Sequence, residues 1–215
     1  MTPNDVPIPP YLRRRPRDKR GYPVPFVVAR DPKSGAWLFA AIDPRAWQQV
    51  VHGHRCAICG RRFKNVFQRS EGIGVGEGVW FIGGGACYEN RYFLDPAMCE
   101  PCARYAIRVC PYLALSSYHR SLDTAFVERG LGKIVHASAP GKPDRFMLAC
   151  TGGYSVRTVK GATGALETLV YATLPWSVVE WWRDGKQVGP ALEHEPPQEH
   201  PGLCESEVFP YGEDG

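Results

Sequence analysis

The sequence has 215 residues, of which 44% are hydrophobic and 22% are charged, an ordinary composition for a globular protein. A chain of this length can bury a substantial core, so we expect one or two domains. It contains no run of about 18 uncharged apolar residues, which excludes a membrane-spanning helix. The N-terminus also lacks the apolar run of a secretory signal, so we expect a cytoplasmic protein.

Charge is unevenly distributed along the chain, although the net charge is only +4. Residues 1–21 carry a net charge of +4 and residues 189–215 carry −7, which leaves +7 for the residues between them. We therefore predict a basic, Pro- and Arg-rich extended arm over 1–21 and an acidic flexible tail over 189–215. The basic side chains of the arm are Arg13, Arg14, Arg15, Arg17, Lys19 and Arg20.

Ordered structure is expected to begin directly after the arm. Two runs rich in apolar residues, at 22–30 and 36–42, flank the turn-like segment DPKSG and predict a β-hairpin. Asp43 and Pro44 then have the residue types of a helix N-cap and a first helical position. A short helix is therefore predicted to follow them and to end at Gly53.

The segment CAICGRRF contains two cysteines, Cys56 and Cys59, in the two-residue spacing that is typical of a zinc knuckle. Gly60 follows them and permits a tight turn. A knuckle supplies two thiolates from one loop, so the other two ligands of a tetrahedral site must come from elsewhere in the chain.

A second pair of cysteines with the same spacing, Cys99 and Cys102, lies in MCEPCARYAIRVCP. Proline is tolerated only in the first turn of a helix, so Pro101 indicates that a helix begins near Cys99. This start places both sulfurs on one side of the first turn, where the helix dipole favours thiolates. The periodicity predicts that the helix continues to Val109.

The 39 residues between the two pairs complete the expected metal-binding unit. We predict strands at Val79–Ile82 and Tyr88–Phe93, and a hairpin turn at the glycine-rich segment 72–78. A knuckle, intervening strands and a helix that supplies the last two ligands describe a treble-clef site for a structural Zn²⁺ ion. Four buried or redox-active thiols without a metal are the alternative interpretation.

Other cysteines and histidines offer alternatives within this region. Cys87 follows a glycine turn and would replace any of the four ligands that proved wrong. His52 and His54 precede the knuckle closely and are alternative ligands or supporting groups. Cys110 lies roughly 12 Å beyond Cys102 along the helix, too far to share its metal, and is interpreted as a packed core thiol.

The residues after the second cysteine pair change in character. Short segments rich in Val, Thr and aromatic residues follow one another up to residue 182, and an Asp-Gly hairpin turn is predicted at Asp184 and Gly185. The predicted fold is α+β, with a treble-clef-like zinc unit over 22–118. Its two short helices pack on a mainly antiparallel, β-rich C-terminal half over 119–188.

Two sets of residues are candidates for a contact surface. A cluster without any acidic residue surrounds the knuckle and can meet phosphates or an acidic protein surface; it comprises Arg55, Arg61, Arg62, Lys64 and Arg69. Asn90 and Arg91 precede the second cysteine pair and either extend this surface or hold their loop by hydrogen bonds. Three tryptophans, Trp176, Trp181 and Trp182, are interpreted mainly as core, with one of the adjacent pair pointing inward.

Four segments resemble, in the same order, a family of uncharacterised proteins encoded by phages and bacterial mobile elements. They are RPRDKRGYPVPFV, CAICGRRF, ENRYFLDPAMCEPCARYAIRVCPYLA and VVEWWRDGKQV, and they lie within residues 15–188. In that family the position of Cys99 is often histidine, which zinc also accepts. The resemblance implies a zinc-binding core and a location in a bacterial host cell, but it implies no reaction.

These observations favour a non-enzymatic function. A zinc ion with four protein ligands has no open position for a water molecule, and HNH-type nucleases need a histidine that is absent between Cys59 and Cys99. We expect a zinc-stabilised binding protein of phage or mobile-element origin that contacts nucleic acid or a bacterial host protein through its basic surface. A nuclease or another enzyme with a structural zinc site is the alternative.

Overall fold

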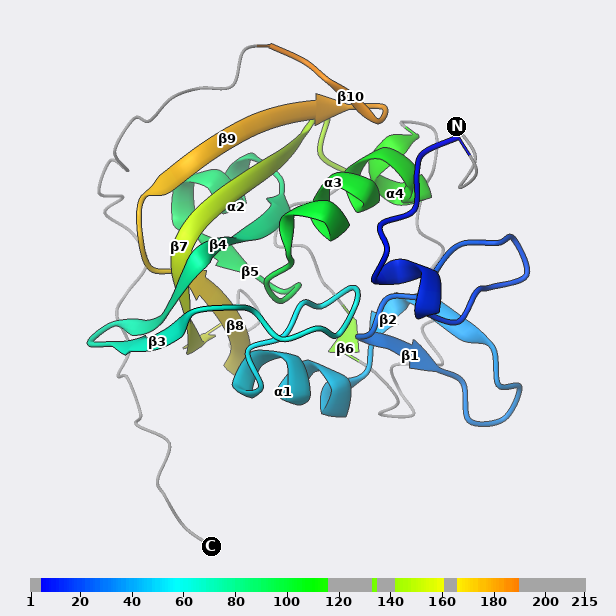
Figure 1. Ribbon diagram of the computed structural model, residues 1–215, viewed down its shortest axis with the longest axis horizontal. Coiled ribbons are helices and arrows are strands. Elements are labelled where there is room, and N and C mark those ends of the chain that lie inside the picture. The colour runs from blue at the N-terminus through cyan, green and yellow to red at the C-terminus, as the bar shows by residue number, and fades with distance from the viewer. Residues whose placement is uncertain (1–4, 116–132, 135–141, 161–165, 190–215) are drawn as a thin grey trace, which may run out of the picture.

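The computed structural model describes residues 5–115, 133–134, 142–160 and 166–189, and its described part is α+β (Figure 1). All strand pairings in the described residues are antiparallel, as predicted. The predicted tail over 189–215 lies outside the described residues except for Gly189. No helix among the described residues has the length and hydropathy needed to cross a membrane.

A small three-stranded sheet and a short helix form the first part of the fold. The hairpin predicted before Asp43 is confirmed, and it consists of β1 (Val28–Arg30) and β2 (Trp37–Ile42). The outer edge of β2 pairs with β6 (Lys133–Ile134), which gives the strand order β1-β2-β6. The side chain of Asp43 accepts hydrogen bonds from the backbone N–H groups of Arg45 and Ala46. The predicted cap therefore starts α1 (Pro44–His52), which ends at Gly53.

The larger sheet has seven strands, and its central member is the long strand β7 (Phe146–Lys160). One edge of β7 pairs with β4, and its other edge pairs first with β9 and then with β8. Beyond these neighbours, β3 pairs with β4, β10 pairs with β9 and β5 pairs with β8. The bounds of the other six strands are β3 (Val66–Arg69), β4 (Gly72–Gly83), β5 (Tyr92–Phe93), β8 (Leu166–Ala172), β9 (Trp176–Arg183) and β10 (Lys186–Gln187). Strands from both predicted halves of the chain therefore share one sheet.

Three further helices lie beside this sheet, and Figure 1 shows α3 to the right of β7, next to β4. They are α2 (Gly85–Asn90), α3 (Glu100–Val109) and α4 (Pro111–Ala114). Among the described residues there are thus four α-helices instead of the two that the sequence predicted. One continuous core includes Trp47 of α1, Phe81 of β4, Ile107 of α3 and Leu148 of β7, so the small helices and the sheet are packed as a unit.

Three local predictions are wrong for reasons that the structure makes clear. The glycine-rich segment 72–78 is not a turn but part of β4, whose pairing with β7 shifts register between Gly74 and Val79. The turn of the β3–β4 hairpin lies just before this segment, at residues 70–71. Tyr88 belongs to α2 instead of a strand, and only Tyr92–Phe93 is extended. The three tryptophans interpreted as core are all buried, which confirms that interpretation, but Trp181 and Trp182 are both buried where one of the pair was expected to point inward.

The described part of the N-terminal segment is folded, which corrects the prediction of an extended arm. A 3₁₀ turn (Leu12–Arg14) buries Leu12 to 1% exposure within the main core. Arg15 donates through Nε to the backbone oxygen of Val24 at 2.9 Å. Apolar residues on either side of the arginines, Leu12 and Val24, are too few to give a periodic pattern, but they are buried and hold this segment on the body.

Arg91 is a buried structural residue, which corrects its assignment to a contact surface. The residue is only 5% exposed. Its guanidinium donates to the backbone oxygen of Ala172, at 2.7 Å, and to that of Leu174. Its guanidinium carbon also lies 4.5 Å from the ring centroid of Trp176. Arg91 has a left-handed backbone conformation at the end of α2 (φ 64°), so it closes this helix and ties it to the segment between β8 and β9.

Replacing Arg91 with alanine should lower the free energy of unfolding by about 2–4 kcal/mol, because two backbone carbonyls lose a charged donor inside the protein. Chemical denaturation measures this change. Lys160→Ala is the matched control, since Lys160 is exposed, and it should change the stability by less than about 0.5 kcal/mol. Equal effects of the two substitutions would contradict the structural role of Arg91.

Candidate metal centre

The four cysteines predicted to bind zinc lie together in the structure, although 39 residues separate the two pairs. The sulfur atoms of Cys56, Cys59, Cys99 and Cys102 all lie within 4.8 Å of one another, and those of Cys59 and Cys99 are 4.0 Å apart. Four thiolates at the vertices of a tetrahedron around Zn²⁺, with bonds of about 2.3 Å, have sulfurs about 3.8 Å apart. The cluster therefore has the composition and dimensions of a tetrahedral metal site.

The knuckle holds the first two ligands in a tight turn. The backbone N–H of Gly60 donates to the oxygen of Cys56 at 2.9 Å, and the N–H of Cys56 donates to the oxygen of Arg61 at 2.8 Å. Gly60 has a positive φ of 75°, and a Cβ atom there would lie 2.5 Å from the ring of Phe26. Glycine is thus required at this position both by the backbone conformation and by the close approach of the ring.

The second pair is brought to the knuckle by two sets of backbone hydrogen bonds. Trp80 of β4 and Met98 exchange both of their backbone hydrogen bonds, each at 2.9 Å. On the other side, the N–H of Ala57 donates to the oxygen of Ala97 at 3.0 Å. The segment before α3 is therefore held between the large sheet and the knuckle, which fixes where the helix begins.

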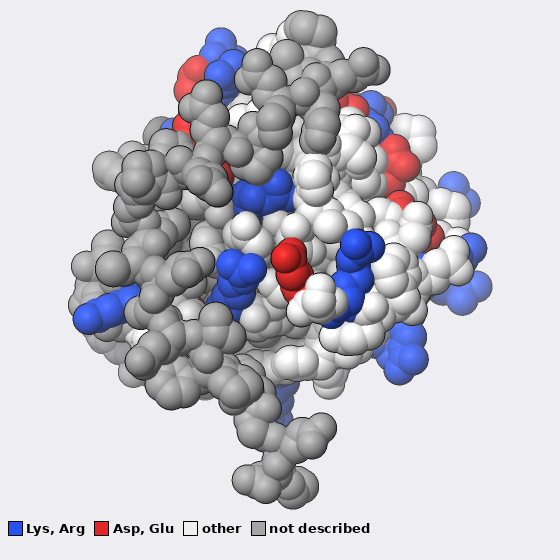
Figure 2. All heavy atoms as spheres, turned by 90° about the vertical axis from the view of Figure 1, so that its left-hand side faces the viewer, with Lys and Arg blue, Asp and Glu red and all other residues white. Residues whose placement is uncertain are grey.

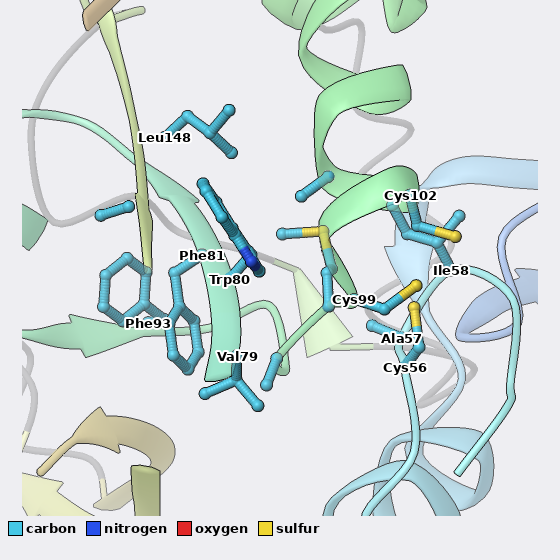
Figure 3. Close-up of a cluster of buried hydrophobic side chains, with 14 of the residues drawn as sticks. Cys56, Ala57, Ile58, Val79, Trp80, Phe81, Phe93, Cys99, Cys102 and Leu148 are labelled. Atoms are coloured by element: carbon cyan, nitrogen blue, oxygen red, sulfur yellow. The ribbon is translucent and has the colours of Figure 1, made fainter. Parts of the chain in front are cut away.

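The beginning of α3 explains the proline between the two cysteines. Cys99 is the N-cap residue, Pro101 lies in the first turn, and the N–H groups of Cys102 and Ala103 both donate to the oxygen of Cys99. Pro101 has no N–H to leave unpaired there, so it is tolerated. Figure 3 shows the side chains of Cys99 and Cys102 on the side of α3 that faces the knuckle, with Cys56 opposite them. The predicted start of the helix is confirmed.

A charged contact fixes α3 on the sheet. Arg104 donates two hydrogen bonds to the carboxylate of Glu180 on β9, at 3.0 and 3.1 Å, and its guanidinium lies 4.8 Å from the ring centroid of Trp80. The indole N–H of Trp182 donates to the same carboxylate at 3.1 Å. Because a bidentate pair fixes the guanidinium in the plane of the carboxylate, the contact restricts the orientation of α3 relative to β9. It therefore helps to hold the first turn of α3, with its two cysteines, in position.

Electrostatics within the cluster favour a bound cation. Burial raises the pKa of the Cys56 thiol well above its ordinary value, whereas hydrogen bonding with Cys102 lowers the pKa of Cys59. Four thiolates at these distances repel one another strongly, and a divalent cation removes that repulsion. The donor set suits Zn²⁺, since soft thiolate ligands in a tetrahedral arrangement favour this ion.

The remaining cysteines and the histidines are placed elsewhere. Cys87 is half-buried in α2 and is not part of the cluster, and Cys110 is half-buried at the end of α3 instead of fully packed. His54 contacts the hydroxyl of Tyr154 through Nδ1 at 3.0 Å, and that hydroxyl donates to the oxygen of Val51. Burial, followed by the charges of His52 and Arg62, lowers the pKa of His54. These histidines are not grouped with the four sulfurs.

The basic residues around the knuckle differ in their environments. Arg55 donates to the oxygen of Gly60 at 3.1 Å, and Arg61 lies over the exposed ring of Tyr11, with its guanidinium carbon 4.1 Å from the centroid. The remaining members of this cluster are exposed and comprise Arg62, Lys64 and Arg69. Asn90 is half-buried, and its side-chain oxygen accepts from the backbone N–H of Tyr92, which supports its structural interpretation.

The knuckle, the β3–β4 hairpin and α3 follow one another in the order of a treble clef, and they define an α+β protein with a four-cysteine centre that can hold a metal ion. A comparison of the chain with protein-family models found no match, and neither did comparisons with curated proteins and with solved structures. The properties of the centre therefore rest on its own geometry.

Replacing Cys102 with serine should remove the bound metal and lower the melting temperature by many degrees, because binding of a structural zinc ion contributes directly to the free energy of folding. Elemental analysis of the reduced protein and thermal unfolding measure the two effects. Cys87→Ser, a matched change outside the cluster, should keep one zinc ion per chain and nearly all of the stability. If Cys102→Ser also kept its zinc, the assignment of this ligand would be wrong.

Proposed function

We propose that the chain is a zinc-stabilised, non-enzymatic protein that contacts nucleic acid through a basic surface around its knuckle. The zinc ion would hold the knuckle on α3, and the knuckle in turn would display its basic residues. The proposal of an origin in a phage or bacterial mobile element rests on the sequence resemblance alone.

The observation that carries the proposal is that two basic segments, far apart in the sequence, lie against each other at the knuckle. Arg61 stacks on Tyr11, which directly precedes the 3₁₀ turn, and Arg15 lies over Phe26, whose ring contacts Gly60. The N-terminal basic residues and the cluster at 55–69 are thus neighbours. Residues 5–77 together contain fourteen Lys or Arg and six Asp or Glu, a net charge of +8, which is twice that of the whole chain.

Several members of this surface are exposed without an acidic partner, whereas others are paired within the protein. Arg13 and Arg14 are exposed on the 3₁₀ turn, although Arg13 also donates through Nε to the oxygen of Ile8 at 3.3 Å, and Lys19 is exposed beyond it. Arg17 donates to the oxygen of Gly21 at 3.0 Å, and Arg20 pairs with Asp18 at 2.7 Å. Exposed Lys and Arg side chains without an acidic partner are the groups that neutralise phosphates.

The face at the left-hand side of Figure 1, where β3 and β9 lie, offers no comparable concentration of positive charge among its described residues. Figure 2 shows the face at the left-hand side of Figure 1, where basic side chains stand apart from one another and acidic side chains lie among them. A mixed surface of this kind gives a weak field, while a surface with a clear excess of positive charge attracts a polyanion. Around the knuckle the basic residues outnumber the acidic ones, although Glu77 lies 4.0 Å from the guanidinium of Arg61. The charge distribution thus favours the knuckle side as the contact surface.

The enzyme alternative has less support in the described residues. Apart from the four cysteines, they contain no group of three or more His, Cys, Asp or Glu side chains that could hold a metal ion. A site with four thiolates leaves no open coordination position for a catalytic water. A bacterial host protein remains the alternative partner, and it becomes an outcome of the binding experiment below.

Binding to a labelled oligonucleotide should weaken steeply as salt rises, because each neutralised phosphate releases counterions. Fluorescence anisotropy between 50 and 200 mM salt should give a slope of log K against log[salt] of about −0.7 for each contact with a single strand, or −0.9 with a duplex. The double substitution R13A/R14A should reduce the magnitude of this slope by about the value of two contacts, and Lys160→Ala should leave it unchanged.

Undetectable affinity for DNA and RNA at 50 mM salt, with zinc and fold intact, would overturn the nucleic-acid proposal. A stoichiometric protein partner recovered from bacterial extract would then favour the host-protein alternative. Loss of this partner in R13A/R14A would show that the same surface is used.

A further inference from the structure

A depression beside the knuckle suggests where on the basic surface a ligand is held. It lies between the end of α1 and the knuckle loop, and its lining is contributed by Phe26, Gln49, His52, Gly53, Arg55 and Arg62. Three of these six residues, His52, Arg55 and Arg62, are basic or can be protonated, and none is acidic. We propose that this depression is a phosphate-binding site, which deepens the proposed function and rests on it.

The two arginines of the depression are placed by the backbone of the knuckle. Arg55 and Arg62 lie opposite each other in an isolated antiparallel bridge. The hydrogen bonds of Cys56 to Arg61 and of Phe63 to His54, both 2.8 Å, bracket this bridge. Cys56, one of the four cysteines of the metal centre, directly follows Arg55 in this paired segment. The metal centre would therefore also fix the spacing between the guanidinium groups of Arg55 and Arg62.

The two arginines differ in the way they can serve a ligand. Arg55 is half-buried and is anchored by its hydrogen bond to the oxygen of Gly60, which leaves its other N–H groups available at a fixed position. Arg62 is exposed, and its side chain has no hydrogen-bond or salt-bridge partner among the described residues. A fixed guanidinium beside a free one suits an oxyanion, which can accept bidentate hydrogen bonds from Arg.

The rest of the lining is consistent with an oxyanion. His52 and Gln49 are exposed at the end of α1 and add N–H donors, and neither side chain has a hydrogen-bond partner among the described residues. Phe26 forms a wall that is already held by Gly60 and Arg15, so it shapes the depression. The site therefore presents several donors around a small concave surface and no carboxylate that would repel a phosphate.

A phosphate group can come from a nucleic-acid backbone or from a small phosphorylated molecule, and one pair of experiments separates the two. In the first, anisotropy compares the wild-type chain with Arg62→Ala and with Lys160→Ala. Lys160→Ala is a control that also removes one positive charge, because Lys160 is exposed at the end of β7, outside both the depression and the proposed contact surface. In the second, inorganic phosphate is titrated while amide resonances are followed by NMR.

Arg62→Ala should weaken oligonucleotide binding about 5- to 10-fold, similarly for all sequences, and lower the salt slope by about the value of one contact. Lys160→Ala should change the affinity less than about 2-fold. Inorganic phosphate should shift the amide resonances of Gly53 and Arg62 in the wild-type chain. Arg62→Ala should abolish the shift at Gly53, and Arg62→Lys should restore part of the affinity.

Two results would overturn parts of the account separately. If the oligonucleotide binds and Arg62→Ala behaves like Lys160→Ala, the depression is not the phosphate site, while the proposed nucleic-acid function stands. If phosphate shifts Gly53 but no oligonucleotide binds, the site is real and its ligand is a small phosphorylated molecule, so the proposed function fails. Absence of both effects would remove the phosphate site altogether. Zinc content, measured for every variant, shows that the fold is intact.

Discussion

The mutual approach of four sulfur atoms is the constraint on which the rest of this structure depends. Cys56 and Cys59 come from a loop, and Cys99 and Cys102 come from the start of α3, yet all four sulfurs lie within 4.8 Å of one another. Thiolates at that distance repel, so a cation at the centre converts an unfavourable arrangement into a favourable one. The same cation would fix the knuckle against the helix.

The hydrogen bonds around the centre show how this local constraint extends through the fold. Backbone bonds join the knuckle to Ala97 and join Met98 to Trp80 on β4, so the metal ligands and the large sheet are positioned by one short segment. Arg104 then clamps α3 to Glu180 on β9. A metal centre connected in this way stabilises much more than its own loop, which is typical of structural zinc sites.

The sequence was most informative where a residue type has only one favourable position. Pro101 placed the start of α3, Asp43 placed the start of α1, and Asp184 and Gly185, with φ values of 50° and 71°, form the predicted turn between β9 and β10. The cysteine spacing indicated the metal centre because few other arrangements need it. These are local rules, and they do not depend on what packs against the element.

Predictions failed where tertiary contacts decided the outcome. Arg91 had the composition of a surface residue, yet two backbone carbonyls and Trp176 hold it inside, and no local pattern encodes that pairing with residues about eighty positions away. Trp181 and Trp182 are both buried because the sheet is covered on both faces at β9. Likewise, Gly152 and Gly153 have low β-propensity, but pairing with β4 and with residues 172–173 carries β7 through them as one strand.

In the proposed function, the metal centre of this basic body organises the surface that contacts nucleic acid. The N-terminal turn and the knuckle, which were separate basic segments in the sequence, are joined through the contacts of Tyr11 with Arg61 and of Arg15 with Phe26. X-ray absorption at the zinc edge, recorded on the reduced, purified protein, tests the central claim most directly. The account predicts one zinc ion per chain with four sulfur neighbours at about 2.3 Å. A first shell of nitrogen or oxygen atoms, or a protein that folds without stoichiometric zinc, would contradict it.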